Sequence, residues 1–129
     1  MLPDTYPGLA SPQAEEGNKY DHGKPRMDLI PPEAIFASAT VFAGGAEKYG
    51  DRNWEKGMGW GRIFGALNRH LWAWWGGRGP TSTNFALGEL DPETKHSHMW
   101  HVLTCAMMLV AYEERRAGND DRLTVDKAP

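Results

Sequence analysis

Residues 91–117 read DPETKHSHMWHVLTCAMMLVAYEERRA, and this stretch carries the clearest helix start in the chain. Asp91 stands in the N-cap position and Pro92 fits the first helical position, because its missing N–H would have no helical partner there. We expect the helix to continue to about residue 117, where Gly118 supplies the stop. Its apolar residues recur at spacings of three and four and therefore form one arc: Met99, Val102, Leu103, Ala106, Leu109 and Val110.

Two further amphipathic patterns precede this stretch and predict helices over about residues 32–49 and 62–75. Their apolar faces comprise Ile35, Ala39, Phe42, Ala43 and Ala46 in the first, and Ile63, Phe64, Leu67, Leu71 and Trp74 in the second. Loops over residues 50–61 and 78–90 separate the helices, and no segment alternates with the period of two that a strand requires. The expected fold is all-α, with three main helices joined by long loops.

The length of 129 residues suits one domain with a core of its own. We divide the chain into a flexible tail over residues 1–18, a single helical domain over 19–118 and a flexible C-terminal tail over 119–129. Three helices with long loops bury their apolar faces only modestly, and a second copy of the chain would cover them. We therefore expect a homo-oligomer.

Composition and charge exclude several classes of protein. The 14 basic and 17 acidic residues give a net charge of −3, so binding to nucleic acid, which needs a basic face, is not expected. The one cysteine cannot form an internal disulfide, which favours the reducing cytoplasm. The chain has no signal-peptide pattern and no long uncharged apolar run, so we expect no membrane association.

Three histidines are the strongest candidates for chemistry. At about 100° per residue, four polar residues of the third predicted helix fall within an arc of roughly 60°: Thr94, His98, His101 and Cys105. His70 lies beside the apolar face of the second predicted helix. We predict that His70, His98 and His101 line one cavity as catalytic groups that bind phosphate or transfer protons. The alternative is that they are boundary residues bonded to neighbouring carbonyls.

Asp91 and Glu93 are the acids nearest to these histidines in sequence and are the predicted metal ligands. Mg²⁺ prefers oxygen donors and keeps several waters when it bridges phosphates, so two carboxylates suit it, and Mn²⁺ is the alternative ion. Asp91 also has a structural interpretation as an N-cap, and Glu93 as a residue that favours the helix dipole. A zinc site made of His98, His101 and Cys105 is a further alternative.

The end of the first predicted helix and the loop after it offer groups that suit a nucleotide. Lys48 and Arg69 would neutralise phosphates, whereas Asn53 could read a purine edge. Tyr49 and Trp54 would provide stacking surfaces for a base. We predict these five as substrate-binding residues. The alternative for charged residues in this region is solvated surface, where such residues usually lie.

Four blocks of sequence follow one another over about residues 19–113. They are KYD (19–21) with GKPR (23–26) and DLIP (28–31); GAEKYGDRNW (45–54); RHL (69–71) with AWW (73–75); and DPET (91–94) followed by His98 and His101. In this order they resemble the phage dATP/dGTP diphosphohydrolase N-terminal family, the MazZ-type proteins.

The resemblance implies a helical nucleotide pyrophosphohydrolase akin to the MazG class. Such enzymes use Mg²⁺ to split a nucleoside triphosphate between the α- and β-phosphates, giving a monophosphate and pyrophosphate. The implied substrate is a purine deoxynucleoside triphosphate, dGTP or dATP, and a phage-encoded protein would act in the host cytoplasm. The chain lacks the Glu-Glu-x-x-Glu run of better-known MazG enzymes. Its Glu113-Glu114 pair is followed by Arg115-Arg116 instead.

Two functions from other classes stay open at this point. The first is a non-catalytic accessory protein that binds nucleotides or nucleic acid through the Trp, Lys and Arg residues of its loops. The second is a helix bundle for structure or interaction, whose histidines only satisfy polar groups at the edge of the core.

Overall fold

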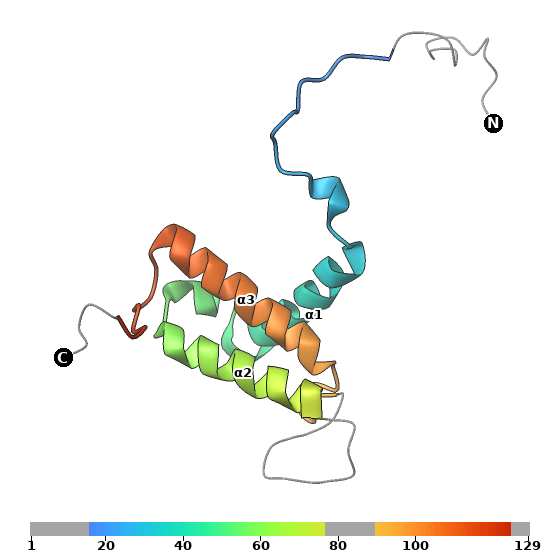
Figure 1. Ribbon diagram of the computed structural model, residues 1–129. Coiled ribbons are helices and arrows are strands. Elements are labelled where there is room, and N and C mark those ends of the chain that lie inside the picture. Colours follow the sequence, from blue (N-terminus) through green and yellow to red (C-terminus); the bar gives the residue numbers. More distant parts are fainter. Residues whose placement is uncertain (1–15, 77–89, 125–129) are drawn as a thin grey trace.

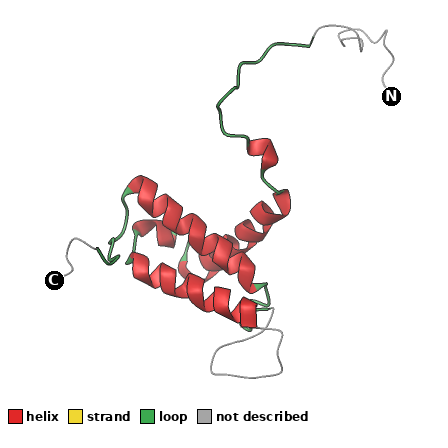
Figure 2. Cartoon of the chain, in the orientation of Figure 1, coloured by secondary structure: helices red, strands yellow, loops and turns green. Residues whose placement is uncertain are grey.

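The computed structural model describes residues 16–76 and 90–124 (Figure 1). Within these ranges the chain forms three α-helices, α1 (Pro32–Tyr49), α2 (Trp60–Gly76) and α3 (His98–Arg115). Short 3₁₀ helices, η1 (Met27–Leu29) and η2 (Asn53–Lys56), precede α1 and α2. The described ranges contain no strand (Figure 2), and their β-type pairing is limited to two isolated bridges. The predicted all-α class with three main helices is confirmed.

The helices α2 and α3 lie side by side and run in opposite directions (Figure 1). The N–H of Trp60, at the start of α2, donates to the carbonyl of Asn119, just after the end of α3 (2.9 Å). Helix α1 crosses behind α3 in this view and packs against it, while residues 16–31 lead away from the three helices. None of the described helices is long and apolar enough to cross a membrane.

The third helix begins six residues later than the sequence predicts, at His98 instead of Pro92. Ser97 is the true N-cap, since its side chain accepts the N–H of Met99 (3.2 Å). Asp91 and Pro92 start a turn that does not continue, because Lys95 adopts a left-handed conformation (φ 64°) that a helix cannot accommodate. The prediction of Asp91 as a helix N-cap is therefore wrong.

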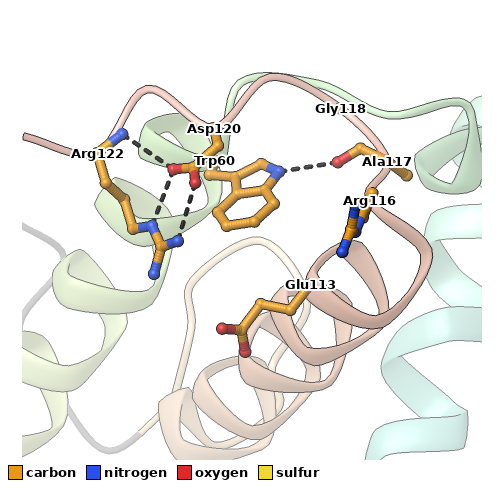
Figure 3. Close-up of a pocket in the computed structure, with 7 residues that line it drawn as sticks. All are labelled: Trp60, Glu113, Arg116, Ala117, Gly118, Asp120 and Arg122. Carbon is orange, nitrogen blue, oxygen red and sulfur yellow. Dashed lines mark hydrogen bonds and ion pairs between the residues drawn. The ribbon is translucent and has the colours of Figure 1, made fainter. Parts of the chain in front are cut away.

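The core of a single chain is small and centres on three buried residues, Trp60, Ile63 and Tyr112. The Tyr112 hydroxyl donates to the Trp54 carbonyl (2.6 Å), and the Trp60 indole N–H donates to the Ala117 carbonyl (2.8 Å; Figure 3). These two bonds satisfy the polar ends of large side chains inside the core. The first bond ties α3 to η2, and the second ties the residues just after α3 to the start of α2.

Several residues of the predicted apolar faces are exposed in the single chain, which agrees with the expectation that three helices bury these faces only modestly. Ile35, Phe64 and Val110 are 48%, 62% and 56% exposed. The helical period correctly placed each of them on an apolar stripe, but these stripes extend beyond the area that the other helices of the same chain cover.

Residues after α3 return to the start of α2. The carboxylate of Asp121 accepts the N–H of Gly61 (2.8 Å), and the guanidinium of Arg122 lies over the Trp60 ring, 4.8 Å from its centroid. Part of the segment that the sequence assigned to a C-terminal tail thus contacts the helices. The predicted N-terminal tail up to residue 15, and the predicted loop up to residue 89, lie outside the described residues.

Two glycines allow the backbones before α2 and after α3 to touch. Gly57 and Gly118 both have positive φ (91° and 74°), and a Cβ at Gly57 would lie 2.6 Å from the Gly118 nitrogen. A Cβ at Gly118 would fall on the carbonyl oxygen of Met58. Any larger residue at either position would therefore force the two segments apart.

We expect Gly118→Ala to lower the free energy of unfolding by about 2–4 kcal/mol, because it adds left-handed strain to a steric clash. Gly44→Ala is the matched control. Gly44 lies within α1, and a Cβ added there would meet nothing within 4 Å, so alanine should stabilise the helix by about 1 kcal/mol. Urea denaturation measures both. Equal effects of the two substitutions would contradict the close approach.

Candidate functional site

Three histidines from two helices meet where the end of α2 lies against the start of α3. The Nδ1 atom of His70, on α2, lies 2.9 Å from Nδ1 of His98, the first residue of α3. The His70 ring stacks on the ring of His101 with 4.4 Å between centroids and 9° between planes. The structure thus brings together the three imidazoles that the sequence placed in one cavity. We call them the histidine cluster.

The loop over residues 91–97 brings a carboxylate to the histidine cluster. The loop is closed by the Asp91 N–H, which donates to the His96 carbonyl (2.7 Å). Within it, one carboxylate oxygen of Asp91 accepts the N–H groups of Glu93 (3.0 Å) and Thr94 (2.8 Å). The same oxygen accepts the Thr94 hydroxyl (3.2 Å). Asp91 is therefore held by the loop that precedes α3.

Thr94 connects Asp91 to the third histidine. Its hydroxyl oxygen lies 2.8 Å from Nε2 of His101. The single hydroxyl proton is donated to Asp91, so we assign the remaining bond as His101 Nε2–H donating to the Thr94 oxygen. This leaves Nδ1 of His101 as the nitrogen that can accept a proton. Thr94 was expected to share a helix face with the histidines. It meets His101 instead because the loop folds back.

Burial keeps two of the imidazoles neutral. It lowers the pKa of His70 to about 4, and the nearby His101 ring adds to the effect while the Asp91 carboxylate opposes it. Burial likewise lowers the pKa of His101, again opposed by Asp91. Burial alone would raise the pKa of Asp91, but hydrogen bonds from Thr94 and the neighbouring imidazoles lower it overall. At neutral pH the site therefore combines the ionised carboxylate of Asp91 with the neutral rings of His70 and His101.

Three of these residues form a potential metal-ligand group. His70, Asp91 and His98 each offer one ligand atom, and these atoms all lie within 4.8 Å of one another. Among the described residues no other group of histidine, cysteine or acid meets this criterion, so the alternative of His98, His101 and Cys105 does not assemble. The Cys105 thiol is partly buried, and burial raises its pKa.

Glu93, the second predicted metal ligand, does not join this group. Its carboxylate pairs with the ammonium of Lys48 (2.9 Å), and the side chains of both residues are mostly exposed. The Lys48 ammonium also lies 5.2 Å from the centroid of the Tyr49 ring. The two acids that the sequence proposed as a pair are thus separated: Asp91 faces the histidines, and Glu93 faces the end of α1.

A hollow of about 1110 Å³ lies between α1, the segment over residues 50–58, α2 and α3. We call it the central hollow. Four of the five predicted substrate-binding residues line it, namely Tyr49, Asn53, Trp54 and Arg69. Trp54 also packs against the core, with 5.5 Å between its ring centroid and that of Phe42. Lys48 is not among the lining residues.

Arg62 was not predicted from the sequence, and it lines the central hollow together with Arg69. The two arginines are seven residues apart on α2, so two helical turns place them on one face. Gly65 lies between them, and a Cβ there would come within 3.3 Å of the Arg69 guanidinium. Neither arginine forms an ion pair with a carboxylate in the described ranges. The spacing of seven was a signal that could have identified Arg62.

Comparison with known proteins identifies the family to which the chain belongs. The profile described as "dATP/dGTP diphosphohydrolase, N-terminal" matches residues 14–122, most of the chain. The chain belongs to this family. The match includes the histidine cluster, Asp91 and every described residue that lines the central hollow. The family resemblance that the sequence blocks indicated is thus confirmed.

One curated relative is a dATP/dGTP diphosphohydrolase of Salmonella phage PMBT28, 31% identical over 106 residues. The match covers 82% of this chain and 33% of that protein, so the chain spans about a third of the length of its relative. No solved structure matches this chain significantly.

We expect Thr94→Val to lower the free energy of unfolding by about 1–3 kcal/mol, because it leaves the half-buried His101 N–H without its acceptor. The matched control is Thr40→Val. The Thr40 hydroxyl bonds only to the Phe36 carbonyl of its own helix, at an exposed position, so its loss should change stability by less than about 0.5 kcal/mol. Chemical denaturation compares the two. Indistinguishable results would argue against the Thr94 bridge.

Proposed function

We propose that this chain binds a purine deoxynucleoside triphosphate, dGTP or dATP, in the central hollow and hydrolyses it to the monophosphate and pyrophosphate. The observation that carries the proposal is the lining of the hollow, which holds two arginines that have no carboxylate partner among the described residues. One of them, Arg69, directly precedes His70 of the histidine cluster on α2. Membership of the family, and the name of the phage relative, support the same reaction class.

The charges of the central hollow favour a polyphosphate. Arg62 and Arg69 present planar guanidinium groups, which bind phosphate oxygens through paired N–H donors. Arg52, another lining residue, is instead paired with the Glu55 carboxylate (3.1 Å), which also accepts Arg115 (3.0 Å). The triphosphate would therefore lie along α2, and Tyr49, Asn53 and Trp54 would contact the base.

The histidine cluster would supply the catalytic groups. A water molecule attacks the α-phosphorus, the bond from that phosphorus to the oxygen bridging to the β-phosphate breaks, and pyrophosphate leaves with that oxygen. The attacking water loses a proton in this step, and a neutral imidazole can accept it. His101 suits this role, because its assigned tautomer leaves Nδ1 as an acceptor.

The Mg²⁺ that the family resemblance implies stays a prediction, and the residues of the cluster do not fit it well. Mg²⁺ takes oxygen ligands, whereas the potential ligand group contains two imidazoles and one carboxylate. Glu93, which would add a second carboxylate, is paired with Lys48. We therefore assign no catalytic step to a protein-bound Mg²⁺. An ion of this kind can still accompany the phosphates of the substrate.

The test is to incubate the purified chain with each of the four dNTPs, with Mg²⁺ or with Mn²⁺, and to measure pyrophosphate. We expect turnover of dGTP or dATP, and a KM at least about tenfold higher for Arg69→Gln, because one phosphate-binding charge is lost. Arg122→Gln is the control, since Arg122 pairs with Asp120 outside the central hollow and should leave KM unchanged. Nucleotide binding without pyrophosphate release would favour the non-catalytic accessory function.

We also propose that two or more copies of this chain associate through their exposed apolar faces. The apolar core of the described single chain contains only five buried residues, which is small for a chain of this length. Aromatic side chains lie exposed on both outer helices, including Phe36 on α1 (74%) and Trp75 on α2 (72%). A second copy that presents the same faces would cover them.

Light scattering coupled to size exclusion should therefore give a mass that is a multiple of 14.4 kDa. We expect Phe36→Lys to shift the distribution toward the monomer, because a buried ammonium would oppose the contact. Tyr20→Lys, at an exposed position in the segment that leads away from the helices, should leave the mass unchanged. A monomeric wild-type chain would rule out self-association.

A further inference from the structure

We propose that His70, Asp91 and His98 form a binding site for a divalent transition-metal ion, in place of the Mg²⁺ site that the sequence predicts. The role of such an ion in phosphate chemistry rests on the proposed function. The site itself rests on the arrangement of donor atoms within the described residues.

The three donors come from three separate segments and lie in one small region. His70 lies on α2, Asp91 in the loop before α3, and His98 at the first position of α3. Their ligand atoms lie within 4.8 Å of one another. Two ligands at about 2.1 Å from one ion lie about 3.0 Å apart at the right angle of an octahedral site and about 3.4 Å apart in a tetrahedral site. The measured distance of 2.9 Å between the Nδ1 atoms of His70 and His98 is compatible with the first of these spacings.

The chemistry of the donors selects the kind of ion. Two imidazoles and one carboxylate form the ligand set of many hydrolytic zinc sites and of non-haem iron sites, in both of which some coordination positions stay open. Mg²⁺ and Ca²⁺ take oxygen ligands instead. The second acid of the sequence motif is committed to the Lys48 ammonium. The available set therefore contains more nitrogen than oxygen.

The surroundings of the three donors restrict their motion, as outer ligand shells do in metal sites. The His70 ring is stacked on His101. Asp91 is held by hydrogen bonds from the backbone and hydroxyl of Thr94. His98 is 2% exposed, so its imidazole has little freedom to move. The donor group is thus largely ordered before any ion arrives, which lowers the entropic cost of binding.

The site lies close to the central hollow along both helices. Arg69, which lines the hollow, directly precedes His70 on α2, and Cys105, also a lining residue, follows His101 by about one turn of α3. An ion at the cluster would be near one end of a polyphosphate held by Arg62 and Arg69. Its open positions could then be filled by water or by phosphate oxygens.

The test is to strip the full chain with a chelator, titrate it with Co²⁺ while recording visible absorption, and measure bound Zn²⁺ per chain by mass spectrometry after dialysis. We expect about one ion per chain and a rise in the thermal midpoint of unfolding on binding. Asp91→Asn should weaken Co²⁺ binding at least about tenfold. The new amide oxygen can still accept the backbone N–H groups of the loop, so this variant should fold.

Two further variants make the result specific. His96→Gln is the control, because His96 stacks on Trp100 (5.1 Å between centroids) outside the donor group, and it should bind Co²⁺ like the wild type. Glu93→Gln distinguishes this site from the Asp91–Glu93 metal site that the sequence predicts. It should bind Co²⁺ normally, and a loss equal to that of Asp91→Asn would overturn the proposal. A wild-type chain that binds neither Co²⁺ nor Zn²⁺ would also overturn it.

Metal binding and turnover fail independently. A chain that binds one Co²⁺ through Asp91 but hydrolyses no dNTP supports the metal site and refutes the proposed function. A chain that hydrolyses dGTP or dATP with Mg²⁺, yet binds no transition-metal ion after stripping, supports the proposed function and refutes the metal site.

Discussion

The antiparallel contact between α2 and α3 is the constraint on which the other features depend. At one end, Gly57 and Gly118 let the two backbones touch, and this contact fixes the register of the pair. Because the register is fixed there, His70 near the other end of α2 faces the first turn of α3. Helix α1 then closes one side of the pair, which leaves the central hollow between the three helices. Both parts of the candidate site thus follow from one helix pairing.

Sequence patterns predicted the helices well where start and stop signals were unambiguous. The first helix was expected over residues 32–49 and is found there, since Pro32 and Gly50 mark its ends clearly. The start of the third helix was ambiguous, because Asp91 and Ser97 are both good capping residues. Only the backbone of Lys95 decides between them, and a left-handed lysine has no sequence signature. Periodicity also could not tell whether Phe64 would be covered by the same chain.

The sequence identified most residues of the candidate site, but it did not predict how all of them are arranged in space. The three histidines were identified from helix faces, and they meet because α2 and α3 pack against each other. The separation of Asp91 from Glu93 could not be predicted, since it depends on a loop whose conformation the sequence did not reveal. Arg69 stood out because it precedes a conspicuous histidine, whereas Arg62 has no such neighbour. The family match adds a likeness to a longer phage protein but does not assign roles to these residues.

The ion pair between Lys48 and Glu93 has a consequence for the electrostatics of the proposed metal site. Exposed pairs of this kind add little to stability. This pair, however, holds the second carboxylate outside the donor group of His70, Asp91 and His98. One carboxylate cannot fully neutralise a divalent cation, so a loaded site would retain an excess of positive charge. Such a site would attract a polyanion such as a polyphosphate.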